Sequence, residues 1–351
     1  MKRRWVKIAL WLAVGGFVAA ASGIVPIKAS SGHWAITTWF LQFAKRRSVA
    51  THTVGLKTPP LNNPDLVVQG AGHYETGCRP CHGSPDLSRP NIPQQMLPQP
   101  PDLIPAVATW EPDELFYIVK HGVKFTGMPA WPAQQRDDEV WAMVAFLLKL
   151  PQLDAKSYRQ LVDGDRVVDD RDHPPAAAAS CGRCHSRGAR TIPRLGGQRP
   201  AYLLAALQAF AQGQRHSGIM QPIAARLSLS EMQEIARYYG RSEALVLPPT
   251  WEAAPAIERG KAIANRGIPP QRVPSCVDCH GPGASRRNPI YPILDGQYAN
   301  YLVLQLDLFK RQRRGGSAYA HLMHPVASGL TPEQMRDVAR YYASLTPGLG
   351  R

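Results

Sequence analysis

The chain is poor in charged residues, in acidic residues and in cysteine. Charged residues make up 19% of its 351 residues, where about a quarter is usual. The 44% hydrophobic content excludes a fully disordered chain, and a mean hydropathy of −0.25 excludes a protein that crosses a membrane many times. The sequence contains only 26 Asp and Glu but 41 Lys and Arg, so its net charge is +15. Such a charge suits nucleic acid, anionic lipid or an acidic protein and does not choose among them.

Only six cysteines are present, and their pairing leaves none for a disulfide. They form three Cys-x-x-Cys pairs, each followed directly by a histidine: Cys78, Cys81 and His82; Cys181, Cys184 and His185; Cys276, Cys279 and His280. Cys-x-x-Cys-His is the attachment sequence of c-type haem, in which both thiols bond to the porphyrin and the histidine becomes the proximal iron ligand. One helical turn brings both sulfurs to one side and places the histidine beneath the ring. The sequence therefore predicts three covalently bound haem c groups.

Zinc and a redox dithiol are the other uses of such pairs. A four-thiolate zinc site needs a second pair about 15 to 20 residues later, whereas these pairs are separated by 103 and 95 residues. Zinc also leaves one pair without a partner and gives no reason for a histidine after every pair. A redox dithiol needs a βαβ setting, which the surrounding sequence does not indicate.

The last two haem motifs lie in an internal repeat. Residues 193–198 match residues 292–297, and an Ala-Arg-Tyr-Tyr segment at 236–239 recurs at 339–342. Each copy predicts a closing helix that starts with a capping box. The first motif belongs to a related but distinct unit, whose closing helix over residues 137–150 is predicted to be amphipathic. The capping boxes are Ser228 with Glu231 and Thr331 with Gln334, and the apolar face of 137–150 holds Trp141, Val144, Ala145 and Leu148.

Each unit also contains a methionine suited to be the distal iron ligand, because a thioether raises the potential of an electron-transfer haem relative to a second imidazole. Met128 stands in a Gly-Met-Pro-Ala-Trp segment, and the repeat aligns Met220 with Met323. The competing histidines are His121 in the first unit, His216 in the second, and His321 and His324 in the third. Core packing is predicted for Met96, Met143, Met232 and Met335.

Two prolines are predicted to orient the proximal histidines. Pro193 and Pro292 follow their motifs at similar distances, and a backbone carbonyl there would fix the tautomer of the histidine. Each could instead be a simple turn proline. In the first unit, the run over residues 90–105 contains too many prolines to choose one.

These motifs resemble those of the class I cytochromes c. Residues 174–348 look like the tandem dihaem members, with Cys-x-x-Cys-His, Pro-x-Leu-x-Gly-Gln, the aligned Met and the Tyr-Tyr helix. The first unit is similar to single-haem domains with a Gly-Met-Pro-Ala-Trp ligand loop. The resemblance implies an all-α fold, with the second and third units paired and their haems close together.

The N-terminus predicts a membrane anchor. Basic residues between Lys2 and Lys7 precede an uncharged stretch over residues 8–27, long enough to span about 30 Å of bilayer. A signal peptide cleaved near residues 19–21 is the alternative, but the stretch exceeds a usual signal-peptide core. Either interpretation exports the chain, so we expect a single-pass protein of the bacterial inner membrane with its haem domains in the periplasm.

The predicted organisation is three class I cytochrome c domains in tandem after a transmembrane helix. Unit one carries a net charge of −3, whereas residues 174–250 and 251–351 carry +6 each. We therefore expect different redox partners at the two ends, because complementary charge speeds encounter. The expected segments are an anchor (1–28), a linker that either lies on the lipid surface or is a spacer (29–66), unit one (67–153), an acidic linker (154–173), unit two (174–245), a linker (246–255) and unit three (256–348).

The predicted function is electron transfer without catalysis, since no proton-transfer or nucleophilic group is needed for it. The family resemblance implies a quinol-oxidising complex as donor and a terminal oxidase as acceptor. One alternative is the cytochrome c subunit of a periplasmic dehydrogenase; another is a haem enzyme such as a peroxidase, which needs an open distal site. Nucleic acid is not an expected partner, because the basic run at 310–314 lies inside a haem domain.

Overall fold

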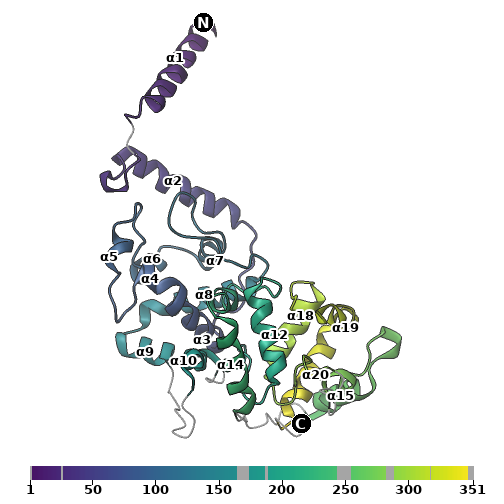
Figure 1. The fold of residues 1–351 in the computed structure, drawn as a ribbon. Helices are drawn as coiled ribbons and strands as arrows, with labels where there is room; N and C mark the ends of the chain where they lie inside the picture. The colour runs from purple at the N-terminus through teal and green to yellow at the C-terminus, as the bar shows by residue number, and fades with distance from the viewer. Residues whose placement is uncertain are drawn as a thin grey trace.

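The computed structural model describes residues 2–24, 27–163, 174–185, 189–242, 254–281, 288–316 and 318–346. Helices, turns and loops make up these residues, and no β-strand occurs among them. The predicted all-α class is therefore confirmed. An N-terminal extension leads into a body in which unit two, with α12 and α14, lies between unit one and the C-terminal helices (Figure 1).

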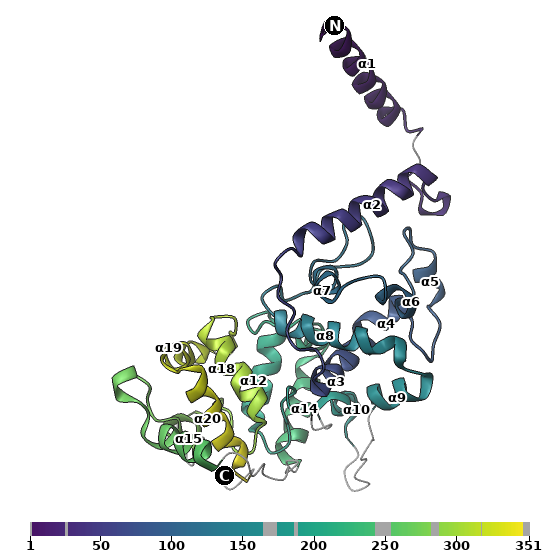
Figure 2. The same ribbon diagram turned by 180° about the vertical axis from the view of Figure 1, so that it is seen from behind.

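Two helices form the N-terminal extension. Helix α1 (Lys2–Ala21) projects away from the body, and α2 (Ala35–His52) lies between α1 and unit one (Figure 2). Within the described chain, one stretch, Arg3–Ala21, is long and apolar enough to cross a membrane. Helix α2 falls in the segment predicted as a linker. Its C-terminal half docks on unit one, where Val49 is buried and Arg46 lies over the ring of Trp110 at 4.9 Å.

Unit one is built around the crossing of its first and closing helices. At that crossing a Cβ on Gly70 would lie 2.3 Å from the carbonyl oxygen of Ala142, so only glycine lets the two backbones approach this closely. Its elements are α3 (Pro64–His73), a π-helical turn (Tyr74–Cys78), α4 (Arg79–His82), α5 (Asn91–Gln94), α6 (Leu103–Val107), α7 (Pro112–His121), α8 (Asp137–Lys149), a 3₁₀ turn (Leu150–Gln152) and α9 (Ala155–Asp163).

Two expectations about unit one were wrong. Helix α8 is not amphipathic: Glu139, Val140 and Phe146 are buried on faces other than the predicted one, because α3, α7 and a loop of unit two cover the helix. The acidic linker contains α9, whose Tyr158 and Val162 are fully buried in the core of unit one. The rest of that linker, residues 164–173, lies outside the described residues.

Units two and three have parallel element orders. Both predicted capping boxes are confirmed at the starts of α14 and α20. Of the linker predicted over 246–255, only its last two residues are described, and they begin α15. The elements are α10 (Ala176–Ala179), α11 (Gly182–His185), α12 (Pro200–Ala211), α13 (Met220–Ala224), α14 (Leu229–Arg241), α15 (Ala254–Arg266), a 3₁₀ turn (Pro269–Gln271), α16 (Val277–His280), α18 (Ala299–Lys310), a 3₁₀ turn (Ala320–Leu322), α19 (Met323–Gly329) and α20 (Pro332–Ser344).

Two buried glutamines join units two and three reciprocally. The amide oxygen of Gln198 accepts from the backbone N–H of Ile293 at 2.8 Å, and its amide nitrogen donates to the carbonyl of Ile293 at 2.9 Å. Gln297 makes the same pair of bonds to the backbone of Arg194, at 3.0 and 3.1 Å. The two glutamines occupy equivalent positions of the repeat, so the repeated sequence forms a symmetric junction.

Candidate haem sites

Each Cys-x-x-Cys-His motif ends in a single helical turn whose last residue is the histidine: α4, α11 and α16. The first cysteine of each pair is partly shielded from solvent, and this burial raises the pKa of Cys78 to about 12 and the pKa of both Cys181 and Cys276 to about 11. These three thiols therefore stay protonated in the chain itself.

A proline carbonyl orients each predicted proximal histidine. A carbonyl oxygen can only accept a hydrogen bond, so Nδ1 carries the proton and Nε2 keeps its lone pair for a metal. In unit one the structure identifies Pro101 as the partner, which the sequence could not single out. The contacts join His82 to Pro101 at 2.9 Å, His185 to Pro193 at 2.8 Å and His280 to Pro292 at 3.0 Å.

Burial keeps the three imidazoles neutral. Loss of solvation is the largest effect on His82, His185 and His280, and it lowers the pKa of each below the ordinary value of 6.5. The hydrogen bond to the proline carbonyl opposes this shift without reversing it. A neutral imidazole is the form that coordinates a metal.

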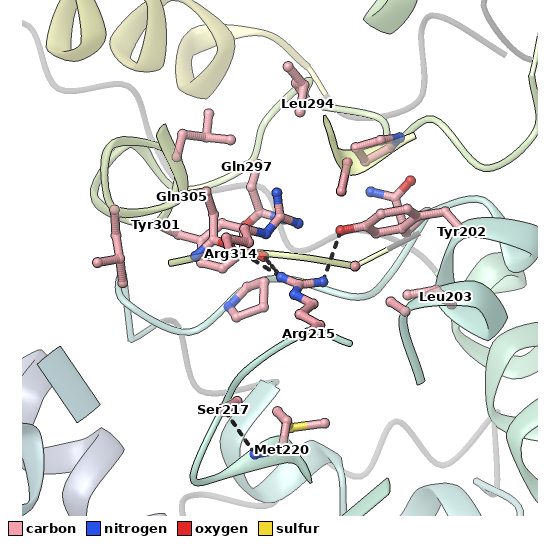
Figure 3. Close-up of a pocket in the computed structure, with 18 of the residues that line it drawn as sticks. Tyr202, Leu203, Arg215, Ser217, Met220, Leu294, Gln297, Tyr301, Gln305 and Arg314 are labelled. Atoms are coloured by element: carbon pink, nitrogen blue, oxygen red, sulfur yellow. Dashed lines mark hydrogen bonds between the residues drawn. The ribbon is translucent and has the colours of Figure 1, made fainter. Parts of the chain in front are cut away.

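Units two and three enclose one shared cavity of about 890 Å³. Its walls are formed mainly by apolar side chains, as expected of a cofactor site. The structure thus brings two complete predicted ligand sets to a single space, part of which appears in Figure 3. The cavity-lining residues include Cys181, Cys184, His185, Met220 and Pro193 from unit two, and Cys276, Cys279, His280, Met323 and Pro292 from unit three.

The competing histidines of units two and three do not line this cavity. Among the described residues, the only histidines that line the shared cavity are the two proximal ones. His324 uses Nε2 to donate to the carbonyl of Arg314 at 3.1 Å, and Nδ1 of the exposed His321 lies 2.8 Å from the carbonyl oxygen of Ala318. This placement favours the two methionines over the histidines as distal ligands.

In unit one, Met128 stands in a tight loop after α7. Its backbone N–H donates to the hydroxyl of Thr126 at 3.1 Å. Met96 was predicted to be a core residue, but it is only half-buried and its thioether lies against Gly127, beside the ligand loop. The remaining predicted core methionines are buried as expected: Met143, Met232 and Met335.

Two buried arginines of the shared cavity identify the kind of group it suits. Arg215 donates to the hydroxyl of Tyr301 at 3.0 Å and to that of Tyr202 at 3.4 Å (Figure 3). Burial, followed by the charge of Arg215, lowers the pKa of Arg314 well below its ordinary value, to about 10, and its buried Nε has no hydrogen-bond partner among the described residues. Buried cations need anionic partners.

The carboxylates that line the cavity do not provide anionic partners for Arg215 and Arg314. Glu139 is the only acidic residue among the described lining residues, and it pairs with Arg136. A bound haem would bring two propionates, which are anions of the kind that Arg215 and Arg314 lack among the described lining residues. The apolar walls, the thiols, the neutral imidazoles and this charge together fit haem c.

Comparisons with known protein families agree with sites for haem c. The family model described as cytochrome c oxidase, cbb3-type, subunit III matches residues 65–147, and the cytochrome c model matches residues 257–346. The chain belongs to the cytochromes c, a family of electron carriers, and its domains are of the class I type.

Individual relatives cover about half of the chain. The thiosulfate dehydrogenase electron acceptor of Thiomonas intermedia is 35% identical over 48% of this chain and 80% of its own length. The protein of the same name from Stutzerimonas stutzeri is 34% identical over 53% of this chain and 88% of its own length. Among solved structures, reduced recombinant cytochrome c4 from Pseudomonas stutzeri is 28% identical, with a TM-score of 0.43 over 48% of this chain and 95% of that one.

Sequence reasoning missed several residues around these sites. The repeat aligns Arg215 with Arg314 and Gln198 with Gln297, and this was the available signal for the arginine pair and for the junction. Glu139 gave no signal, because an acidic residue in the first turn of a helix is ordinary.

Proposed function

We propose that the protein is a membrane-anchored trihaem cytochrome c that transfers single electrons on the periplasmic side of a bacterial inner membrane. The observation that carries this proposal is the shared cavity, which holds two sets of Cys, His and Met side chains. The same histidine-to-proline contact at His82 supports a third site in unit one. A bound haem c supplies the reversible one-electron couple of its iron.

The chain contributes attachment, coordination and shielding. The thiols form the covalent links, and the apolar walls exclude water from the iron. Proline carbonyls hold the proton on Nδ1 of the proximal histidines. The proposed attachment residues are Cys78, Cys81, Cys181, Cys184, Cys276 and Cys279; the proposed axial pairs are His82 with Met128, His185 with Met220 and His280 with Met323; the supporting prolines are Pro193 and Pro292.

Helix α1 is the proposed lipid anchor. The start of α2 supports it, because Trp34, Trp39 and Phe40 are more than half exposed, and aromatic side chains favour the membrane interface. A chain in which a cleavable signal peptide replaces residues 2–24 is expected in the soluble periplasmic fraction. If the full chain is found there as well, the anchor proposal fails.

For the electron donor, the relatives favour a periplasmic dehydrogenase, since two of them bear the name thiosulfate dehydrogenase electron acceptor. A terminal oxidase is the proposed acceptor. The match of unit one to a subunit of cbb3-type oxidase supports a position next to such an enzyme. A quinol-oxidising complex, implied by the family resemblance, is the second candidate donor.

A reduced-minus-oxidised optical spectrum with haem quantification tests the cofactor proposal. Membrane-extracted full-length protein is expected to hold three covalent haems per chain, all low-spin, with the thioether-to-iron band at full strength. Fewer haems would contradict the count. A high-spin fraction that binds carbon monoxide would favour a haem enzyme such as a peroxidase.

Rapid mixing tests the donor. The oxidised protein is combined with thiosulfate and a thiosulfate dehydrogenase, and separately with quinol and a quinol-oxidising complex. Fast reduction by the dehydrogenase, slowed by added salt, is expected if complementary charge guides the encounter. Fast reduction by the quinol-oxidising complex alone would exclude the dehydrogenase as donor.

A further inference from the structure

A carboxylate of unit one reaches into the ligand loop of unit two. Glu139 lies on α8 and is 3% exposed. The hydroxyl of Ser217 donates to one of its oxygens at 2.5 Å, and the backbone N–H of Gly218 donates to the other at 2.6 Å. These two residues lie three and two positions before the predicted ligand Met220.

Ser217 also forms hydrogen bonds with the backbone at the predicted ligand. Its hydroxyl oxygen accepts from the N–H of Met220 at 3.0 Å and from the N–H of Ile219 at 3.3 Å. Figure 3 shows the bond to Met220, at the first residue of α13. A single hydroxyl therefore separates the Glu139 carboxylate from the backbone of Met220.

The described groups in hydrogen-bonding or ion-pair contact with this carboxylate are donors. Arg136 lies 3.0 Å from it and also donates to the carbonyl of His216 at 2.8 Å, while the indole N–H of Trp131 donates to it at 3.3 Å. Burial and the charge of Asp138 raise the pKa of Glu139, while the charge of Arg136 and the donors from Ser217 and Gly218 act against that rise without reversing it. The surroundings are thus arranged to hold an anion that accepts several hydrogen bonds.

Trp131, near the predicted ligand loop of unit one, also contacts Glu139 and lies close to Gly218. It follows Met128 by three residues, and a Cβ added at Gly218 would lie 2.0 Å from its indole nitrogen. Unit three has no such arrangement in its described part, because the repeat places Ala320 where unit two has Ser217. There a 3₁₀ turn precedes Met323 instead.

We propose that Glu139 is a positioning residue for the distal ligand of unit two. Through Ser217 and Gly218 it holds the Met220 loop, so the docking of unit one sets the redox potential of the neighbouring haem. The inference rests on the proposed ligation by Met220. Its physical basis is that groups outside the coordination sphere orient axial ligands and thereby tune the metal.

Two substitutions in the full-length, membrane-extracted protein test this role. Ser217→Ala removes only the bridging hydroxyl, whereas Glu139→Gln keeps the shape of the side chain but places an amide among donors. The midpoint potentials of the three haems and the thioether-to-iron band are measured. One potential is expected to shift and up to about a third of the band to be lost, while the other two potentials stay unchanged. Ser230→Ala, an exposed serine of the same unit, is the matched control and should change neither.

Unchanged potentials and an unchanged band in a folded, fully haem-loaded Ser217→Ala protein would overturn the inference, even if Glu139→Gln fails to fold. Met220→Ala separates this failure from failure of the proposed function. If it removes about a third of the band while Ser217→Ala changes nothing, only the positioning role is wrong. If it leaves the band intact, Met220 is not a ligand and both proposals fall.

Discussion

At the scale of single residues, proline carbonyls and burial determine the state of the histidines. The carbonyls of Pro101, Pro193 and Pro292 hold the proton on Nδ1 of the proximal histidines. Burial favours the neutral ring at these positions, as it does at His73. The neutral form of these imidazoles therefore follows from burial, and the position of the proton on the three predicted proximal histidines follows from one hydrogen bond each.

The distal methionines lead to a redox prediction. Met323→His replaces a thioether by an imidazole, which should lower the midpoint potential of one haem and remove about a third of the thioether-to-iron band. Spectroelectrochemical titration measures both. Met335→Leu is the control, because Met335 is a buried core residue and should leave the potentials unchanged. A full-strength band in the histidine variant would mean that Met323 is not a ligand.

His73 predicts a pH dependence of stability. It packs against Trp131 with ring centroids 4.7 Å apart, and burial lowers its pKa from 6.5 to about 4. Between these pH values the unfolded chain binds the proton and the folded chain does not. The free energy of unfolding therefore decreases as the pH is lowered through this window, by up to roughly 3 kcal/mol. Urea unfolding of the wild type and His73→Phe should agree near pH 7 and diverge near pH 4.5, with the variant losing less. Parallel losses would contradict the assignment.

At the scale of elements, units one and three use the same helix crossing. The first helix meets the closing helix at a glycine, Gly70 on α3 and Gly260 on α15. Packing of these helices brings a backbone carbonyl of the partner to within 2.3 Å of the position of a Cβ at Gly70 and 2.1 Å at Gly260. In unit two the helix before the motif is only the short α10, so this device is absent from its described part.

Gly260→Ala should therefore destabilise unit three. The added Cβ meets the carbonyl oxygen of Asp337 on α20, and a backbone atom moves only if the helix moves. Overpacking costs about 1–3 kcal/mol, which exceeds the gain of up to about 1 kcal/mol from replacing a helical glycine. Thermal unfolding measures the difference. Asn265→Ala, at an exposed position of the same helix, should be neutral or slightly stabilising.

At the scale of the whole molecule, the junctions between units define the shared cavity. Gln198 and Gln297 satisfy backbone groups across the junction of units two and three, and Glu139 does the same between units one and two. These contacts are buried and polar, so each one is costly to break.

The double variant Gln198→Ala and Gln297→Ala should loosen units two and three. Each substitution leaves a buried backbone N–H and carbonyl without partners, at a cost of roughly 1–3 kcal/mol per unsatisfied group. The expected results are a lower unfolding temperature and faster amide exchange at Ile293 and Arg194. Gln212→Ala, at an exposed glutamine of unit two, is the control. Equal unfolding temperatures for the double variant and the control would show that the glutamines do not hold the junction.

Much of the local structure was predictable because it depends on neighbouring residues. The haem motifs form single turns, and the capping boxes at Ser228 and Thr331 start their helices, since all partners lie within four positions. Burial was harder to predict. The acidic composition around α9 indicated a linker, but Tyr158 packs into a core formed by residues far away in the chain.

The sequence by itself determined the chemistry: the thiols, the imidazoles, the thioethers and the repeat that aligns two of the three sites. Only the tertiary structure decided that two sites open into one cavity, that Pro101 faces His82 and that Glu139 reaches the loop of Met220. The physical reason is the separation along the sequence of the residues that make contact. Motif spacing and helical periodicity record contacts within a few residues, whereas Glu139 and Gly218 are separated by 79 positions and meet only because whole units pack together.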